Sequence, residues 1–447
     1  MLALLLIAVL GNSGDCSRAG ERCQMGRGKR GFRDAPDIEF GRGGKGLTSG
    51  ACACVAVTTS RGDALITARA SAGTCMKTGI YSGIANGDLV VCSANLPRIM
   101  PGATGTGQAG ILSEQIRTNS VIRSAELDNV AWTVQDNVVG APVVTANAAV
   151  APDGTTTAEQ IDFPVVANAG EYAEVSSTTF ASITGMSSLF VKGFDGGSGS
   201  LHFTQYKTVQ ANSLAGDCAF VGDSWTRCYG VSTATQIGLA IGPNRLYPTN
   251  STNAPAQSVY VWGADVQSSI AAYGGTSSHI PTTSAAATRA AETSSVTTNL
   301  PAFTLPISFA ATSAPTHPAA HTADSRYLAL GNVTHVNATL MWKSNAGVFQ
   351  CYTSTGAVSS DVLTISNMLY PSTYPMSCSY GFASTATSST IQGKHNNAFL
   401  ADSLFGAMAQ TVPTSLYIGD STAAGALSSE SVIANVCIDA RPSRCRR

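Results

Sequence analysis

The sequence predicts an all-β protein with two tandem β-sandwich domains after a short N-terminal β or irregular region. Short segments alternate between apolar and polar residues, are rich in β-branched and aromatic side chains, and are separated by turns such as Pro152-Asp153-Gly154. Long amphipathic helical patterns are missing, and residues 402–409 are the best candidate for a short helix. A parallel βαβ fold needs helices between its strands, so this class is excluded.

Composition excludes several functional classes. The 447 residues include 26 Lys and Arg against 27 Asp and Glu, for a formal net charge of −1. A balance so close to zero excludes a globally basic nucleic-acid binder and an acidic disordered chain. Charged residues make up 12% of the chain, against a usual ~25%. Together with 44 glycines and many Ser and Thr residues, this low charge is typical of β-rich extracellular or virion proteins.

The first 45 residues fall into two segments. An apolar run opens the chain and is followed by small residues, which favours a signal peptide over residues 1–17, although no Lys or Arg precedes the run. A wrongly assigned start codon and a short buried strand are the alternatives. No window reaches the ~20 apolar residues of a spanning helix, so we expect no integral membrane span in the mature chain. Residues 18–45 carry eight of the 26 basic residues among glycines, which indicates a flexible linker or an electrostatic tether.

Composition and strand pattern divide the remaining chain into four parts. They are a small β region at 46–117, a sandwich at 118–283, a Ser/Thr/Ala linker at 284–300 and a second sandwich at 301–447. The clearest predicted strands of the two sandwiches are 188–192, 201–206, 258–262, 338–342, 348–352 and 415–419.

Twelve cysteines, an even number, are spaced mostly as local pairs. The predicted disulfides are Cys75–Cys92, Cys218–Cys228, Cys351–Cys378 and Cys437–Cys445. Such pairs indicate an oxidising compartment, hence a secreted or cell-surface protein. Free buried thiols are the alternative. Zinc is disfavoured because Cys52-Ala53-Cys54 lacks the usual two-residue spacer and has no nearby histidine.

Several segments in a fixed order resemble phage and prophage tail-fibre or head-appendage proteins. They include Asp63-Ala64-Leu65-Ile66-Thr67, Gln115-Ile116-Arg117-Thr118-Asn119, Arg123-Ser124-Ala125-Glu126-Leu127, Ala151-Pro152-Asp153-Gly154-Thr155, Trp262-Gly263-Ala264-Asp265-Val266, Ser278-His279-Ile280-Pro281-Thr282 and Thr288-Arg289-Ala290-Ala291. The resemblance covers about residues 60–292 and implies a carbohydrate-binding-module-like jelly roll in the first sandwich. It makes a virion location the alternative to secretion. The signal-like start and the cysteines depart from a virion protein, so a secreted surface protein that shares the module is equally compatible.

The second sandwich has a fainter resemblance. Leu416-Tyr417-Ile418-Gly419-Asp420, followed by Ile433-Ala434-Asn435-Val436-Cys437, resembles the usual ending of a laminin-G or concanavalin-A-like sandwich.

Sugar binding requires aromatic platforms together with amides and carboxylates. The best predicted cluster is Trp225 and Tyr229, with Tyr206 on a neighbouring strand and with Arg227 and Asp223 alongside. The Cys218–Cys228 disulfide would stiffen this hairpin. The alternative is that Trp225 is half-buried and structural. The other three tryptophans lie in apolar strand contexts and are expected in the core; they are Trp132, Trp262 and Trp342.

No catalytic pattern is complete, so we expect no enzyme. Gly222-Asp223-Ser224 resembles the nucleophile block of the Gly-Asp-Ser hydrolases, but no histidine has an aspartate three residues before it, and a turn is the simpler interpretation. Glu171 and Glu174 would point to opposite faces of a strand and would not converge as a glycosidase pair. His317 and His321 are separated by Pro318, which denies them a shared helix face.

Structural calcium is the one cofactor that the pattern allows, with Asp153, Asp162 and Asp195 as candidate ligands. The predicted function is a non-catalytic surface or virion protein of fibre, appendage or adhesin type that binds glycan or a cell surface. The first alternative is a structural subunit that self-assembles into a fibre, shell or filament. The second is a secreted hydrolase.

Overall fold

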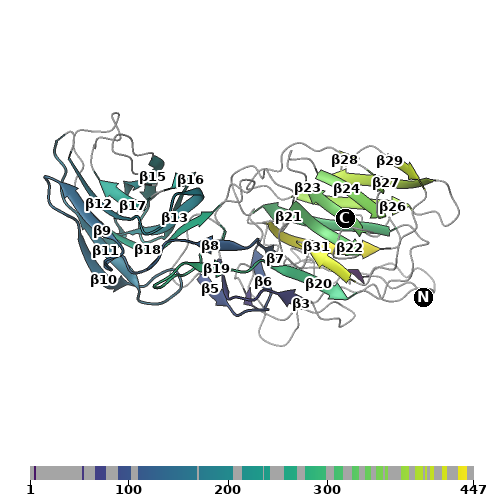
Figure 1. Ribbon diagram of the computed structural model, residues 1–447, viewed down its shortest axis with the longest axis horizontal. Helices are drawn as coiled ribbons and strands as arrows, with labels where there is room; N and C mark the ends of the chain where they lie inside the picture. The colour runs from purple at the N-terminus through teal and green to yellow at the C-terminus, as the bar shows by residue number, and fades with distance from the viewer. Residues whose placement is uncertain are drawn as a thin grey trace, which may run out of the picture. The chain divides into compact units, whose positions relative to one another are not determined.

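The fold is described from a computed structural model of the chain (Figure 1). It describes residues 66–76, 89–101, 109–168, 171–204, 214–234, 236–241, 256–268 and 277–297, and elsewhere Gly419 and the strands named below. All strand pairings among these residues are antiparallel, and the same residues contain no α-helix. The predicted all-β class is therefore confirmed. None of the described segments is a helix long and apolar enough to cross a membrane.

The chain forms two compact units, each built from separated stretches of sequence. Unit 1 comprises Met1–Ala70, Ala94–Gln115 and Ala291–Arg447, and unit 2 comprises Ser71–Ser93 and Ile116–Ala290. The small region predicted at 46–117 is therefore divided between the two units. Its strands are two to five residues long, and apart from β4 and β5, which pair with each other, they become part of larger sheets, because a few short strands cannot enclose a core by themselves.

Unit 2 is a sandwich of two main sheets. The seven-stranded sheet has the order β10 (Val143–Ala149), β11 (Ala158–Phe163), β18 (Gln257–Ser268), β13 (Ile183–Gly193) and β16 (Thr226–Ala234), with β8 (Arg117–Asn119) pairing with β18 and β19 (Ala287–Arg289). The five-stranded sheet has the order β15 (Leu214–Phe220), β14 (Gly199–Thr204), β17 (Ile237–Ile241), β12 (Tyr172–Ser177) and β9 (Thr133–Asn137). A small ribbon pairs β4 (Gly73–Met76) with β5 (Leu89–Cys92). The single 3-10 turn described, η1, spans Phe194–Gly196.

The core of unit 2 lies between the two main sheets. Alternate residues of each strand point inward, and both sheets contribute; examples are Leu189, Val191 and Val261 from one sheet and Val175 and Leu239 from the other. Trp132 belongs to this core, and Trp262 is buried as well, as the apolar contexts predicted.

Unit 1 contains two antiparallel sheets. The larger has the order β2 (Ala53–Cys54), β6 (Arg98–Pro101), β7 (Ala109–Ser113), β31 (Ser431–Asp439), β21 (Ile307–Pro315), β26 (Tyr374–Gly381), β27 (Ser388–His395) and β28 (Ala398–Phe399), with β1 (Leu5–Leu6) on β31 and β29 (Ser403–Gly406) on β27. The other has the order β25 (Val358–Ser360), β24 (Phe349–Thr355), β23 (Ala338–Lys343), β22 (Ser325–Gly331), β30 (Ser415–Ile418), β20 (Thr293–Thr297) and β3 (Ile66–Ala68). Segments far apart in sequence pair directly, as Figure 1 shows for β7 and β31.

All six of the clearest predicted strands are present. They fall within β13, β14, β18, β23, β24 and β30, with ends that differ by a few residues. The short helix predicted at 402–409 is wrong, because this segment contains β29, which pairs with β27. The basic segment 18–45 lies outside the described residues, and the signal peptide stays a prediction.

The linker predicted at 284–300 is wrong for its described part, which contains β19 and β20. Small polar residues do not need to face a core when a strand pairs through its backbone. Glu292, between these strands, instead joins a buried group of two arginines and two glutamates, all no more than 2% exposed. Arg98 donates to Glu292 through Nε at 2.7 Å and to Glu114 through Nη2 at 2.5 Å, and Arg69 pairs with Glu292. Mutual pairing offsets the cost of burying these charges, so the group fixes the segments that carry them.

One predicted disulfide is confirmed. Cys218 of β15 and Cys228 of β16 are bonded, with Cα atoms 5.4 Å apart, and the bond links the two main sheets of unit 2. Cys92 in β5 is also disulfide-bonded, and β5 pairs with β4, which carries Cys75. The side chains of the other predicted pairs lie outside the described residues.

Non-reducing peptide mapping should recover Cys75–Cys92, Cys351–Cys378 and Cys437–Cys445, with Cys218–Cys228 as the internal reference. Local bridges of this kind stabilise a fold by ~2–4 kcal/mol each. Four free thiols among these eight cysteines would contradict both the pairing and the secreted location.

Glu159 is a buried carboxyl group at the inner face of β11. It shares that face with the core residues Ile161 and Phe163, is 1% exposed, and has no hydrogen-bond partner for Oε2. Burial raises the pKa of Glu159 to about 8, and the negative charges of Asp128 and Glu126 add to the increase. Between its ordinary pKa and about 8, the folded protein therefore holds a proton that the unfolded chain has lost.

This proton makes stability depend on pH. As pH rises from about 4.5 to about 8, the free energy of unfolding of unit 2 should fall, by up to ~1.4 kcal/mol per pH unit. Glu159→Gln should flatten the profile and give a higher melting temperature than the parent protein at pH 9. Tryptophan fluorescence suits the measurement, because Trp132, Trp225 and Trp262 all lie in unit 2. Glu171→Gln, at an exposed carboxylate, is the control, and an equal flattening in both variants would contradict the assignment.

Candidate functional site

Strand alternation and register place three side chains in a row on the outer face of the seven-stranded sheet. The residues on either side of Tyr260 in β18 point into the core, so Tyr260 points outward. The same alternation turns Gln160 of β11 and Lys192 of β13 outward. Tyr260 is paired with Gln160 on one side and with Lys192 on the other. The three side chains therefore lie side by side across neighbouring strands.

Aromatic rings surround the ammonium group of this row. Lys192 Nζ lies 5.4 Å from the centre of the Tyr260 ring and 5.8 Å from that of Trp225. Phe194 of η1 packs on Tyr260 at a centroid distance of 5.5 Å, and both of these rings are half-buried. Lys192 is 9% exposed, and its ammonium group makes no hydrogen bond or ion pair with the described residues. Its charge is thus held by ring faces rather than by a carboxylate.

Two loops bring carboxylates to this row. Asp195 lies in η1, directly after β13, and Asp223 lies in the turn between β15 and β16. The loops contact each other, because the backbone N–H of Gly222 donates to Ser198 Oγ at 3.0 Å. Gly196, with a φ of 76°, lies so close to Asp223 that an added Cβ would be 3.6 Å from Asp223 Oδ2.

A third carboxylate comes from β11. Asp162 accepts two hydrogen bonds from Gln160 Nε2, at 2.9 and 3.1 Å. Burial raises the pKa of the Tyr260 hydroxyl, and the negative charges of Asp195, Asp162 and Asp223 raise it further, so all three carboxylates act on this ring. We call the resulting group the Tyr260 site; it consists of Tyr260, Phe194, Lys192, Asp162, Asp195 and Asp223.

The glycan cluster predicted from the sequence is wrong at its centre. Trp225 is completely buried, partly beneath Lys192, and cannot stack on a sugar. Arg227 is 2% exposed and donates into the sheet, to Ser188 Oγ and Asp265 Oδ2. Tyr229 is exposed but pairs with Ser188, four residues along β13 from Lys192, or ~13 Å away.

Asp223 is thus the predicted residue that joins the Tyr260 site, while Tyr206 lies outside the described residues. Sequence reasoning missed Tyr260, Lys192 and Phe194. The alternating strand at 258–262 already indicated that Tyr260 faces away from its valine neighbours. It did not indicate which residues of other strands lie beside Tyr260.

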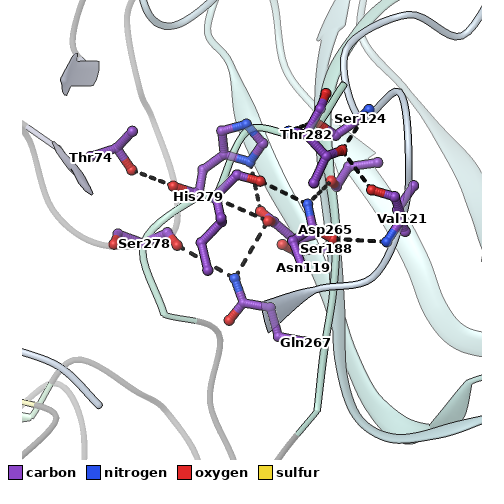
Figure 2. Close-up of polar contacts among 12 residues, drawn as sticks. Thr74, Asn119, Val121, Ser124, Ser188, Asp265, Gln267, Ser278, His279 and Thr282 are labelled. Carbon is purple, nitrogen blue, oxygen red and sulfur yellow. Dashed lines mark hydrogen bonds and ion pairs between the residues drawn. The ribbon is translucent and has the colours of Figure 1, made fainter. Parts of the chain in front are cut away.

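The outer face of the same sheet also carries a buried polar network around Asp265 (Figure 2). Its Oδ2 accepts from His279 Nδ1 at 2.7 Å and from Arg227 Nη2 at 3.1 Å, and its Oδ1 accepts from the backbone N–H of Ile280 at 3.1 Å. The His279 ring packs against Trp262, with centroids 4.6 Å apart. The network therefore fastens residues 277–282 onto β18.

This network contains an Asp–His pair like that of a hydrolase, but its histidine ring makes no hydrogen bond to a nucleophile among the described residues. His279 is 1% exposed, and its Nε2 has no hydrogen-bond partner among the described residues, whereas a general base must reach a nucleophile. The Gly222-Asp223-Ser224 segment forms the turn between β15 and β16, as the simpler interpretation predicted. Among the described residues, no three His, Cys, Asp or Glu side chains are arranged to hold a metal ion.

Comparisons with known proteins give weak likenesses. No family model matches the chain, and no curated protein matches its sequence. An alginate lyase from a Chlorella virus is 7% identical, with a TM-score of 0.24 over 34% of this chain and 77% of that chain. A CBM22 tandem domain from Paenibacillus barcinonensis is 11% identical, with a TM-score of 0.22 over 74% and 97%. A tail fibre protein from an E. coli phage is 11% identical, with a TM-score of 0.19 over 76% and 40%. Likenesses of this size assign neither a family nor a function.

Asp265→Asn should destabilise unit 2 by ~3–5 kcal/mol, because the Arg227 charge would be left buried without a carboxylate. Denaturant unfolding followed by tryptophan fluorescence measures the loss. Asp223→Asn, at an exposed carboxylate of the same unit, should change stability by less than ~0.5 kcal/mol. Equal effects of the two substitutions would show that Asp265 does not fasten the fold.

Proposed function

We propose that this protein is a non-catalytic surface or virion protein that binds glycan through the Tyr260 site. The observation that carries the proposal is a half-buried aromatic pair, Tyr260 and Phe194, bordered by carboxylates and one ammonium group. Sugars present C–H faces that stack on aromatic rings and hydroxyl groups that hydrogen-bond to charged side chains.

Each part of the site has a task in this proposal. The Tyr260 ring supports one sugar ring, and Phe194 widens the platform. Asp195 and Asp223 accept hydrogen bonds from hydroxyl groups, because a carboxylate is an acceptor. Lys192 is free to donate to a ring or hydroxyl oxygen, since no carboxylate among the described residues occupies its protons.

The positions of Glu171 and Glu174, the two glutamates considered as a glycosidase pair, support a non-catalytic function. Glu174 is 4% exposed and accepts hydrogen bonds from Gln135 and Gln236. Glu171 is partly exposed and accepts hydrogen bonds from Asn168 in its own loop. The two carboxylates have different surroundings and do not share one ligand position.

A secreted or cell-surface location is part of the proposal, with the virion as its alternative. The Cys218–Cys228 disulfide supports it, because such bonds persist in oxidising compartments.

Self-assembly is the second candidate function, and one feature favours it. The strands β9 and β10 are edge strands of the two main sheets of unit 2, and they follow each other in sequence. Valines in and between them are strongly exposed: Val134 at 38%, Val138 at 81% and Val143 at 60%. Exposed apolar side chains at a sheet edge are typical of interaction surfaces.

Tyr260→Ala in the full chain should weaken glycan binding by about 5- to 150-fold, because a central aromatic anchor contributes ~1–3 kcal/mol. A glycan array selects the ligand, and titration calorimetry measures its affinity. Tyr260→Phe should retain most of the affinity, since the platform remains.

Tyr229→Ala is the matched control, because Tyr229 is an exposed tyrosine on the same outer face of the sheet. It should leave the affinity unchanged. Equal losses in Tyr260→Ala and Tyr229→Ala, or no binding to any glycan on the array, would reject the proposal.

A further inference from the structure

We infer that the Tyr260 site selects glycans that carry free amino groups and rejects polyuronates. This inference rests on the proposed function and names its ligand class. The juxtaposition that carries it is a lysine whose Nζ lies over two aromatic rings, on a sheet face that also carries Asp162 and is bordered by two contacting loops with Asp195 and Asp223.

The first step is the charge of the site. Asp162, Asp195 and Asp223 act on the Tyr260 ring, and Lys192 is the single described cation beside it. Three carboxylates against one ammonium group leave an excess of two negative charges. A ligand with one carboxylate on every sugar ring is repelled by this excess, and a ligand with ammonium groups is attracted.

The second step is the state of Lys192. Its side chain is nine-tenths buried, and its Nζ lies over the Trp225 and Tyr260 rings without a hydrogen bond or ion pair to the described residues. An ammonium group held in this way keeps its donors available. We therefore expect the Lys192 ammonium group to donate a hydrogen bond to a neutral oxygen of the ligand, such as a ring or hydroxyl oxygen.

The third step is the separation of the carboxylates. They come from three different elements: β11, η1 and the turn between β15 and β16. Among the described residues, no three acidic or metal-ligating side chains are arranged to hold a metal ion, so the three aspartates do not form a single cation site. Separated carboxylates suit the separate hydroxyl and ammonium groups of a sugar better than a single cation.

The test uses the full chain and three oligosaccharides of equal length: a glucosamine hexamer, its fully N-acetylated counterpart and a uronate hexamer. In low salt, calorimetry should give the tightest binding for the glucosamine hexamer, about fivefold above the acetylated hexamer, and the weakest for the uronate. In 1 M salt the Debye length falls to ~3 Å, so the difference between the charged ligands should shrink.

The double substitution Asp195→Asn with Asp223→Asn should remove the preference for the amino sugar and keep binding to the acetylated hexamer. Both side chains are exposed, so the fold should tolerate the change. Asp128→Asn, at an exposed carboxylate outside the site, is the control and should keep the preference.

The outcomes separate this inference from the proposed function. Equal or tighter binding of the uronate hexamer, or an unchanged preference in the double variant, overturns the charge selectivity. If charge selectivity is overturned but Tyr260→Ala still abolishes binding of the hexamer that binds, the proposed glycan-binding function is retained without the charge selectivity. Absence of binding to all three hexamers and to every arrayed glycan overturns both.

Discussion

The burial of one carboxylate, that of Asp265, is the constraint on which unit 2 depends. A buried charge is tolerated only when it is paired and hydrogen-bonded, and Asp265 obtains its donors from Arg227, His279 and the backbone of Ile280. These donors come from β16 and from the segment 277–282, so satisfying the charge fixes that segment on the outer face of the sheet. The fixed segment then covers aromatic residues, including Trp262, that would otherwise be exposed.

Several of the pieces of sequence that resemble phage tail-fibre proteins contribute residues to this network. Two of them contain Asp265 and His279, and a third ends at Asn119, which donates to the carbonyl oxygens of Ala264 and Ile280. Asn119, Asp265 and His279 therefore meet in one buried framework (Figure 2). Within this framework they hold strands and loops together. The Tyr260 site lies along the same sheet but is built mostly from residues outside those pieces.

Two of the charged groups described above show opposite uses of the same chemistry. In unit 1, Arg69 and Arg98 are buried against glutamates, so their charges are neutralised inside the fold. At the Tyr260 site, the Lys192 ammonium group lies over aromatic rings and forms no ion pair with the described residues, so its hydrogen-bonding capacity is available to a ligand. A structural ion pair thus differs from a binding site in whether its charged groups already have hydrogen-bond partners within the fold, and not in the types of residue involved.

The sequence by itself determined the all-β class, the principal strands and the Cys218–Cys228 bond, because alternation, turn residues and cysteine spacing are local signals. It also determined that Tyr260 faces away from its valine neighbours. Only the tertiary structure decided that Trp225 is buried, that Tyr260 lies beside Lys192, and that residues 284–300 contain strands of both units. The physical reason is that burial and neighbourhood depend on register between strands distant in sequence, and no local pattern encodes which strand pairs with which.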